Sequence, residues 1–252
     1  MKNIIYELKQ NKIICLAWVI LSKLAIVNEK EFKLLRRLVN EGDIVFDIGA
    51  NIGSYTYALS STVGNSGKVF AFEPLPDNLR LLHFIKESMR LSNTTVIPEA
   101  LSEKQGEMSL SVPIIGGVKK NTRAYLASEH SYDSIIVKVT TISEIVDRYQ
   151  LNRIDFIKCD AEGAENMIFR GGENVIKKYA PIILCELGEA SVNYGLDDNE
   201  VFDYIKKLCD YNVYVFLNNK LKPVNEYEKE HNNYIFTKQI YNDTTSNLVT
   251  RR

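Results

Sequence analysis

The stretch "DIVFDIGANIGSYTYALS" occupies residues 43–60 and decides the fold class of this chain. Its first part, Asp43–Gly49, is typical of a buried strand, and the segment from Gly53 onward has the pattern of a helix that ends at Gly64. In an open parallel sheet, ligands bind beyond the carboxyl ends of the strands, where glycine lets the backbone approach them closely. The loop between this strand and this helix is therefore either a ligand-binding loop or a tight turn without a ligand.

Strand-like and helix-like segments alternate along the rest of the chain. Strands are predicted at 68–74, 94–101, 154–160 and 181–187, with an extra edge strand at 106–113 and two late strands at 212–218 and 232–238. Helices are predicted at 76–91, at 140–151, at 163–179 with a break at Gly171 and Gly172, and at 197–211 behind acidic capping residues. This alternation predicts an α/β fold with a mostly parallel sheet, helices on both faces and one antiparallel late strand.

The composition is that of an ordinary globular protein. Of 252 residues, 45% are hydrophobic and 25% are charged, and the formal net charge is −1. This length suits one large domain, or one domain with an appendage. Because the charges balance, no overall field attracts nucleic acid, and we expect no nucleic-acid partner.

The cysteines are widely spaced along the chain. Cys15, Cys159, Cys185 and Cys209 form no CxxC pair, so the sequence indicates neither a zinc site nor a disulfide framework. Such cysteines are typical of a reducing compartment, and we therefore expect a cytoplasmic protein.

The N-terminal segment "IICLAWVIL", residues 13–21, is strongly apolar. It is shorter than the roughly 20 residues that span a bilayer, and no convincing cleavage site of a signal peptide follows it. We expect a helix that packs on the main domain or on the second subunit of a homodimer, with a helix on a membrane surface as the alternative. The expected organisation is a helical appendage at 1–40, a main domain at 41–240 and a flexible tail at 241–252.

Two features predict the kind of ligand. The loop G-A-N-I-G, residues 49–53, departs from the G-x-G-x-x-G pattern and contains no basic residue, so it suits a ligand without phosphates. Glu73 ends the second strand, 20 residues after Gly53, where an acidic side chain can accept the hydroxyls of a ribose. Together they predict a nucleoside cofactor, for which S-adenosylmethionine is the natural candidate. We expect Asp47 to face its charged amino-acid end and Ala100 to contact its adenine.

Five longer segments carry the remaining motifs: "VFDIGANIGSYTYALS", "VFAFEPLPDNLRLL", "IPEALSEKQGEMSL", "IDFIKCDAEGAENMIFRGGENVI" and "PIILCEL". Together they resemble the FkbM family of S-adenosylmethionine-dependent methyltransferases, over roughly residues 43–187. The resemblance implies a seven-stranded Rossmann-like methyltransferase domain at 41–240. It also implies O-methylation of a hydroxyl on a sugar, a glycan or a hydroxylated natural product. The residues that fall on the family's cofactor motifs are Asp47, Gly49, Asn51, Gly53 and Glu73.

Methyl transfer to oxygen needs a nucleophile held in line with the methyl–sulfur bond and a group that takes its proton. The stretch "KCDAEGAE", residues 158–165, ends the fourth strand and places carboxylates beside the expected pocket. We expect Asp160 to contact the cofactor's amino group or the acceptor hydroxyl, and Glu162 to act as general base or to position the acceptor. Glu165 is either a charge at a helix start or an acceptor contact. Glu186, at the end of the fifth strand, is expected to line the acceptor pocket.

Further candidates lie around this stretch. Arg123 and His130 belong to a segment rich in hydrogen-bonding side chains, and they either serve the acceptor and its proton or lie in a solvated loop. Lys158 is expected to pair with a nearby acid. No D…D-N ligand set follows the carboxylates, so we expect no metal, with a divalent cation held by these carboxylates as the alternative.

Two other function classes are open at this point. An NAD-type oxidoreductase would carry a glycine pattern for a pyrophosphate, which the loop at 49–53 lacks. A non-catalytic or glycan-binding module on the same fold would not depend on the acceptor carboxylates. Cofactor titration tests the oxidoreductase and the non-catalytic module, and the activity of Glu162→Gln tests the glycan-binding module.

Overall fold

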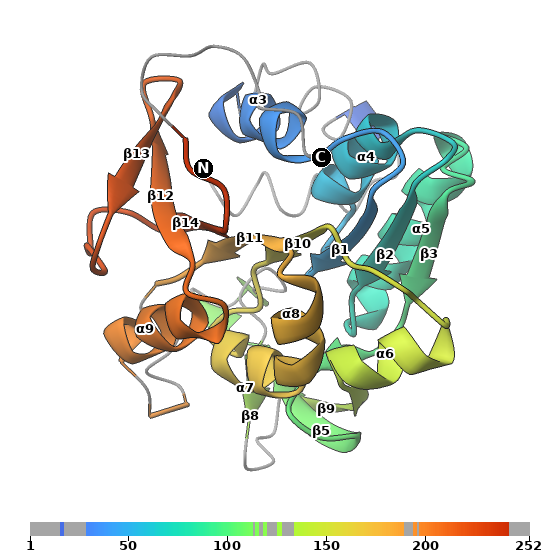
Figure 1. Cartoon of the computed structure of the whole chain (residues 1–252). Coiled ribbons are helices and arrows are strands. Elements are labelled where there is room, and N and C mark those ends of the chain that lie inside the picture. Colours follow the sequence, from blue (N-terminus) through green and yellow to red (C-terminus); the bar gives the residue numbers. More distant parts are fainter. Residues whose placement is uncertain are drawn as a thin grey trace.

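Figure 1 shows the computed structural model, which describes residues 16–17, 29–112, 114–115, 118–119, 125–127, 134–188, 194–195 and 197–241. Its centre is an eight-stranded sheet with the order β13-β12-β14-β11-β10-β1-β2-β3. The strands are β1 (Ile44–Ile48), β2 (Lys68–Phe72), β3 (Thr94–Ile97), β10 (Phe156–Cys159), β11 (Ile182–Glu186), β12 (Asn212–Leu217), β13 (Lys220–Val224) and β14 (Asn233–Thr237). The strands from β3 to β11 in this order run parallel, whereas β14 is antiparallel to both of its neighbours.

Helices cover both faces of the sheet (Figure 1). One face carries α3 (Glu29–Leu38), α4 (Ser54–Val63) and α5 (Pro76–Ser88). The other carries α6 (Ile142–Arg148), α7 (Glu165–Arg170), α8 (Glu173–Tyr179) and α9 (Asp198–Leu208). The expected acidic cap of α9 is confirmed, because Asp197 and Glu200 form a capping box there. The break that separates α7 from α8 lies at the predicted glycines.

The predicted fold class is confirmed: the sheet is mostly parallel and lies between two layers of helices. It has eight strands rather than seven because the chain turns back directly after β12. Asn218 and Asn219 have φ values of 51° and 61° and form a two-residue turn in which Leu217 pairs with Lys220. Asparagine tolerates this left-handed conformation, which tight hairpins need, and the turn adds β13 at the sheet edge.

A second, smaller sheet lies beside the carboxyl end of β3. Its order is β4-β9-β5-β8, built from β4 (Ala100–Leu101), β5 (Gly106–Ser111), β8 (Tyr125–Ala127) and β9 (Ser134–Thr140). A separate hairpin joins β6 (Ile114–Ile115) to β7 (Val118–Lys119). The extra strand expected at 106–113 therefore exists, but it pairs with β8 and β9 instead of extending the central sheet.

Side chains alternate between two cores along each central strand. In β1, Phe46 and Ile48 join the core under α6–α9, whereas Val45 joins the core under α3 and α4. Asp47 shares the face of Val45, and the parallel register sets it directly beside Lys158 of β10. Both charged side chains are buried, so the sheet itself encloses an ionisable pair next to the carboxyl ends of its strands.

The N-terminal part contributes to the same structure. α3 buries Leu34, Leu35 and Leu38 in one core with β1 and α4. Of the apolar segment at 13–21 the structure describes residues 16–17, and Leu16 packs against a cluster that includes Leu81 of α5. Within the described residues, no helix combines the length and the apolar character that a membrane span requires. The expected domain boundaries, the dimer and the membrane-surface contact stay predictions.

Candidate active site

A pocket opens at the carboxyl ends of β1, β2 and β10, where the sequence predicted a ligand. The space between its walls amounts to about 650 Å³, and this figure includes a part that is open to solvent. Its walls come from the loops after these three strands, from α5 and α7, and from the small sheet. The lining residues are Ile48, Gly49, Asn51, Phe72, Glu73, Pro74, Asn78, Ala100, Leu101, Leu110, Asp160, Ala161, Glu162, Ala164 and Ile168.

The glycine loop is shaped by close packing as well as by the pocket. Gly49 has a φ of 75°, and a Cβ added there would lie 1.9 Å from the carbonyl oxygen of Asp160. Gly53 has a φ of 96°, and a Cβ there would lie 2.7 Å from Leu82 Cδ1. Both glycines are therefore required by the fold. Gly49 and Asn51 also line the pocket, whereas Gly53 is not among its described lining residues.

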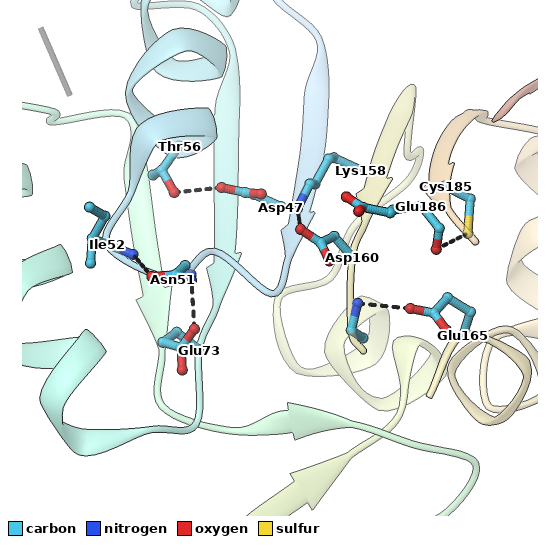
Figure 2. Close-up of polar contacts among 11 residues, drawn as sticks. Asp47, Asn51, Ile52, Thr56, Glu73, Lys158, Asp160, Glu165, Cys185 and Glu186 are labelled. Atoms are coloured by element: carbon cyan, nitrogen blue, oxygen red, sulfur yellow. Dashed lines mark hydrogen bonds and ion pairs between the residues drawn. The ribbon is translucent and has the colours of Figure 1, made fainter. Parts of the chain in front are cut away.

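Glu73 is fixed in the pocket wall by backbone groups. Its Oε2 accepts the N–H of Asn51 at 2.8 Å (Figure 2), and its Oε1 accepts the N–H of Leu75 at 2.9 Å. The side chain is 5% exposed, and this burial raises its pKa to about 7 because the hydrogen bonds offset only part of the desolvation. Glu73 is thus a preorganised acceptor that changes its charge near neutral pH.

Asp47 lies behind the loop, on the α4 face. Its Oδ2 accepts the hydroxyl of Thr56, and Oδ1 has no hydrogen-bond partner among the described residues. Burial raises the pKa of Asp47, and the nearby Lys158 ammonium opposes that rise. Asp47 is fully buried and is not among the described residues that line the pocket, so its expected contact with the cofactor stays a prediction.

Lys158 pairs with Asp160 across 3.0 Å, which confirms the expected pairing (Figure 2). The ammonium also lies 4.9 Å from the ring centroid of Tyr55. Burial alone would lower the pKa of Lys158, but the carboxylates of Asp160 and Asp47 outweigh it and raise that pKa. Asp160 itself lines the pocket, so a buried cation stands directly behind an acidic group that faces the ligand space.

The loop after Asp160 is held by Glu165. Glu165 Oε1 accepts the N–H of Ala161 at 2.8 Å, and burial raises the pKa of this carboxyl to about 7. Glu165 is 2% exposed and is absent from the described pocket lining, which favours a structural role over the expected acceptor contact. Glu162 does line the pocket, with a φ of 51° that is uncommon for a residue other than glycine.

The other candidates fall in different places. Ala100 lines the pocket at the side of the small sheet, as expected for an adenine contact. Glu186 is exposed at the end of β11, on the face where Lys158 lies, and it contributes to the high pKa of that lysine. Arg123 and His130 lie outside the described residues. The catalytic and acceptor-binding roles assigned to all of these residues stay predictions.

Sequence reasoning missed Asn78. This residue lies in the first turn of α5, is 1% exposed and lines the pocket beside Glu73. Its side chain donates a hydrogen bond to the carboxylate of Glu73, while its Oδ1 has no partner in the described part of the chain. The available signal was a polar residue shortly after the strand-ending acid, but an amide at a helix start is usually a cap.

The residues present fit S-adenosylmethionine. Glu73 and Asn78 offer fixed acceptors for hydroxyl groups, Asp160 and Glu162 suit a cationic ligand, and an apolar wall suits a flat ring. The described lining contains no lysine or arginine to bind a pyrophosphate. Asn78 Oδ1, a buried acceptor that has no partner among the described residues, would suit a ligand that brings a hydrogen-bond donor.

The described residues also contain a group of potential metal ligands away from the pocket. Glu228, Glu230 and His231 offer atoms within 4.8 Å of one another in the turn before β14, and His231 forms an ion pair with Glu228. Partly exposed acidic groups of this kind are common without a metal. The expectation that the pocket needs no metal is untested.

Comparison with known proteins adds three findings. The model of the methyltransferase FkbM domain matches residues 47–213. The hexuronic acid methyltransferase AglP of Haloferax volcanii is 28% identical over 171 residues, which cover 67% of this chain and 64% of that enzyme. The crystal structure of methyltransferase FkbM from Methylobacillus flagellatus matches with a TM-score of 0.54 and 18% identity, covering 79% of this chain and 44% of the other. This chain therefore spans less than two thirds of either relative, and the structural match supports the fold alone.

Proposed function

Because the chain belongs to the FkbM methyltransferase family, we propose that it is an S-adenosylmethionine-dependent O-methyltransferase acting on a hydroxyl group of a sugar or glycan. The similarity to a hexuronic acid methyltransferase supports a sugar over other hydroxylated natural products as the acceptor. The observation that carries the proposal is the composition of one pocket: a fixed carboxylate that suits a ribose, an acidic loop, and no basic residue in the described lining.

When bound, S-adenosylmethionine supplies a methyl group on a positively charged sulfur, which is a strong electrophile. The protein therefore has to hold the two reactants in line and remove one proton. Glu73 binds the ribose through a carboxylate that two backbone N–H groups hold in place. Leu101 and Leu110 provide an apolar wall for the adenine, beside Ala100. Asp160 attracts the ammonium group at the methionine end.

Glu162 takes the proton from the acceptor hydroxyl. It lines the pocket two residues after Asp160, on the loop that Glu165 braces. Its left-handed backbone conformation is the type of local strain that gathers at functional sites, which supports a functional reason for a glutamate at this position. His130 is the second candidate for this step.

An NAD-type oxidoreductase is less well supported. A pyrophosphate carries negative charge, and its usual partners are arginine, lysine or a glycine-rich helix start. The part of the pocket that the structure describes is lined by Glu73, Asp160 and Glu162, which would repel that group.

Transfer of a labelled methyl group tests the proposal directly. The purified protein is incubated with labelled S-adenosylmethionine and with two acceptor panels, one of sugars that includes hexuronic acids and one of hydroxylated aromatic compounds. The proposal predicts labelled sugar products, and it predicts a much lower rate for Glu162→Gln than for Glu107→Gln, an exposed residue of β5 outside the pocket. Labelling of the second panel alone would contradict the sugar acceptor.

A further inference from the structure

The carboxylate of Glu73 has too few free acceptor positions for a ribose diol. Its Oε1 already accepts the N–H of Leu75 and its Oε2 that of Asn51, at 2.9 and 2.8 Å. The side chain of Asn78 donates a third hydrogen bond to it. A carboxylate offers about four lone-pair positions, so only about one is left for a ligand hydroxyl. A ribose brings two hydroxyls side by side, and the second needs another acceptor.

Asn78 carries the acceptor that this count requires. Asn78 lines the same pocket, and its Oδ1 is a buried atom that has no hydrogen-bond partner among the described residues. A buried acceptor without a donor is unfavourable, and native proteins rarely leave one unless a ligand or water completes it. Because the amide nitrogen is directed to Glu73, the oxygen of the same amide is the atom left for a ligand.

We propose that Asn78 is the second ribose acceptor, so that Glu73 accepts one hydroxyl of the cofactor and Asn78 Oδ1 accepts the neighbouring one. This inference rests on the proposed function, because it takes the ligand to be a nucleoside. The hydrogen bond between the two side chains places the two acceptors next to each other, as the vicinal hydroxyls of a ribose require. The amino group of the adenine is at the other end of the nucleoside, so it does not compete for this acceptor.

An amide suits this position better than a carboxylate. The amide donates to Glu73 on one side and accepts from the ligand on the other, which no carboxylate can do when it is ionised. A second carboxylate in direct contact with Glu73 would also repel it in a buried setting, where like charges interact strongly. The residue type at position 78 is therefore part of the cofactor recognition and not only a helix start.

Calorimetric titration tests the inference with three ligands: S-adenosylhomocysteine and its 2′-deoxy and 3′-deoxy forms. In the unmodified protein, loss of either hydroxyl should weaken binding, by roughly tenfold for a hydrogen bond to a buried acceptor. Asn78→Ala should weaken binding of S-adenosylhomocysteine by a similar factor. The variant should also bind one deoxy form more weakly than the unmodified protein does, by the same factor. Its affinity for the other deoxy form should be unchanged, because that form lacks the hydroxyl that donates a hydrogen bond to Asn78.

A matched control is Asn166→Ala, an asparagine of α7 with 5% exposure that accepts a hydrogen bond from Arg170 outside the described pocket lining. It should leave all three affinities unchanged. Equal losses with both deoxy forms in Asn78→Ala would show that Asn78 acts only by holding Glu73, and would overturn the inference. If Asn78→Ala does not fold, titration of the unmodified protein with the two deoxy forms still tests the inference. A deoxy form that binds as well as S-adenosylhomocysteine would also overturn the inference. A protein that binds none of the three ligands would refute the proposed function as well.

Discussion

The two ends of the pocket carry the same kind of side chain in opposite surroundings (Figure 2). At the β2 end, Glu73 is held by backbone N–H groups and by Asn78, all of them uncharged donors. At the β10 end, Asp160 lies 3.0 Å from the ammonium of Lys158. An acid that is held by neutral donors suits the recognition of neutral hydroxyls. An acid with a buried cation behind it suits a site where charge must stay fixed.

The difference would suit a ligand with two unlike ends, as the proposed cofactor has. Burial brings the pKa of Glu73 to about 7, so its charge depends on the pH and on whether a donor occupies the pocket. The Lys158 ammonium keeps its proton, because the carboxylates of Asp160 and Asp47 raise its pKa. The ammonium at the β10 end therefore stays charged over the physiological range, whereas the charge of Glu73 at the β2 end depends on the pH and the ligand.

The largest expected effect concerns the acidic loop after β10. If Glu162 takes the acceptor proton, Glu162→Gln lowers kcat by about 10²- to 10⁴-fold, the usual contribution of a general base. Binding of S-adenosylhomocysteine should change little, because the substitution removes a proton acceptor and keeps the shape. Single-turnover rates and calorimetry on the same variant separate the two quantities. Full activity in this variant would move the proton step to another residue, with His130 the next to test.

The charge pair at the β10 end should also matter for stability. Lys158→Met leaves the fully buried Asp47 without its neighbouring cation, and we expect the free energy of unfolding at pH 8 to fall by about 3 kcal/mol. The loss should be smaller at pH 5 than at pH 8, because burial raises the pKa of Asp47 and a lower pH favours its neutral form. Urea unfolding at both pH values measures this.

Lys138→Met, at an exposed lysine of β9, is the control and should change stability by less than about 0.5 kcal/mol. Equal losses for the two variants would mean that Lys158 is not needed to balance the buried acid.

The smallest effect is a pH dependence at the β2 end. The pKa of Glu73 rises from 4.5 to about 7 in the folded protein, and a ligand hydroxyl donates more strongly to the ionised carboxylate. Binding below pH 7 therefore requires loss of a proton, and affinity for S-adenosylhomocysteine should be about tenfold lower at pH 6 than at pH 8. Glu73→Gln should abolish this pH dependence. Glu165 also has a pKa of about 7, and Glu165→Gln should keep the pH dependence because Glu165 is not among the described pocket-lining residues.

The raised pKa of Glu73 also makes the stability of the fold depend on pH. Because the folded-state pKa of Glu73 lies above its unfolded value, Glu73 contributes stability that is fully present below about pH 4.5 and is lost as the pH rises through about 7. The pocket thus keeps a buried acid at a cost to the unliganded fold, on the order of 3 kcal/mol at pH 8. A flat binding profile between pH 6 and 8 would contradict this account of Glu73.

Much of the fold follows from local patterns. The order of strands and helices was predictable because apolar periodicity and caps mark each element, as at Asp197 before α9. The small sheet was not predictable, because the partners of the strand at 106–113 are set by long-range pairing with β9. The extra strand β13 depends on a two-residue turn at Asn218 and Asn219, and a pair of asparagines between two apolar runs is a sequence signal for such a turn.

Some features of the site were likewise predictable from the sequence, and others were not. The place of Glu73 in the pocket wall was predictable because it depends on the end of a strand, and its role in binding stays a prediction. The place of Asp47 behind the pocket depends on strand alternation together with the neighbouring strand, since the order β10-β1-β2 sets it beside Lys158. The proposed role of Asn78 could not be recognised from the sequence because it depends on one oxygen without a partner among the described residues, which is a property of packing.

The most direct test of the central claim is calorimetric titration of the unmodified protein with S-adenosylhomocysteine, with NAD and Glu73→Ala alongside. The account predicts binding of S-adenosylhomocysteine alone, with a dissociation constant on the order of 1 μM, and a loss of about 100-fold in Glu73→Ala. Binding of NAD, or an unchanged dissociation constant in Glu73→Ala, would contradict the assignment of this pocket as a site for S-adenosylmethionine.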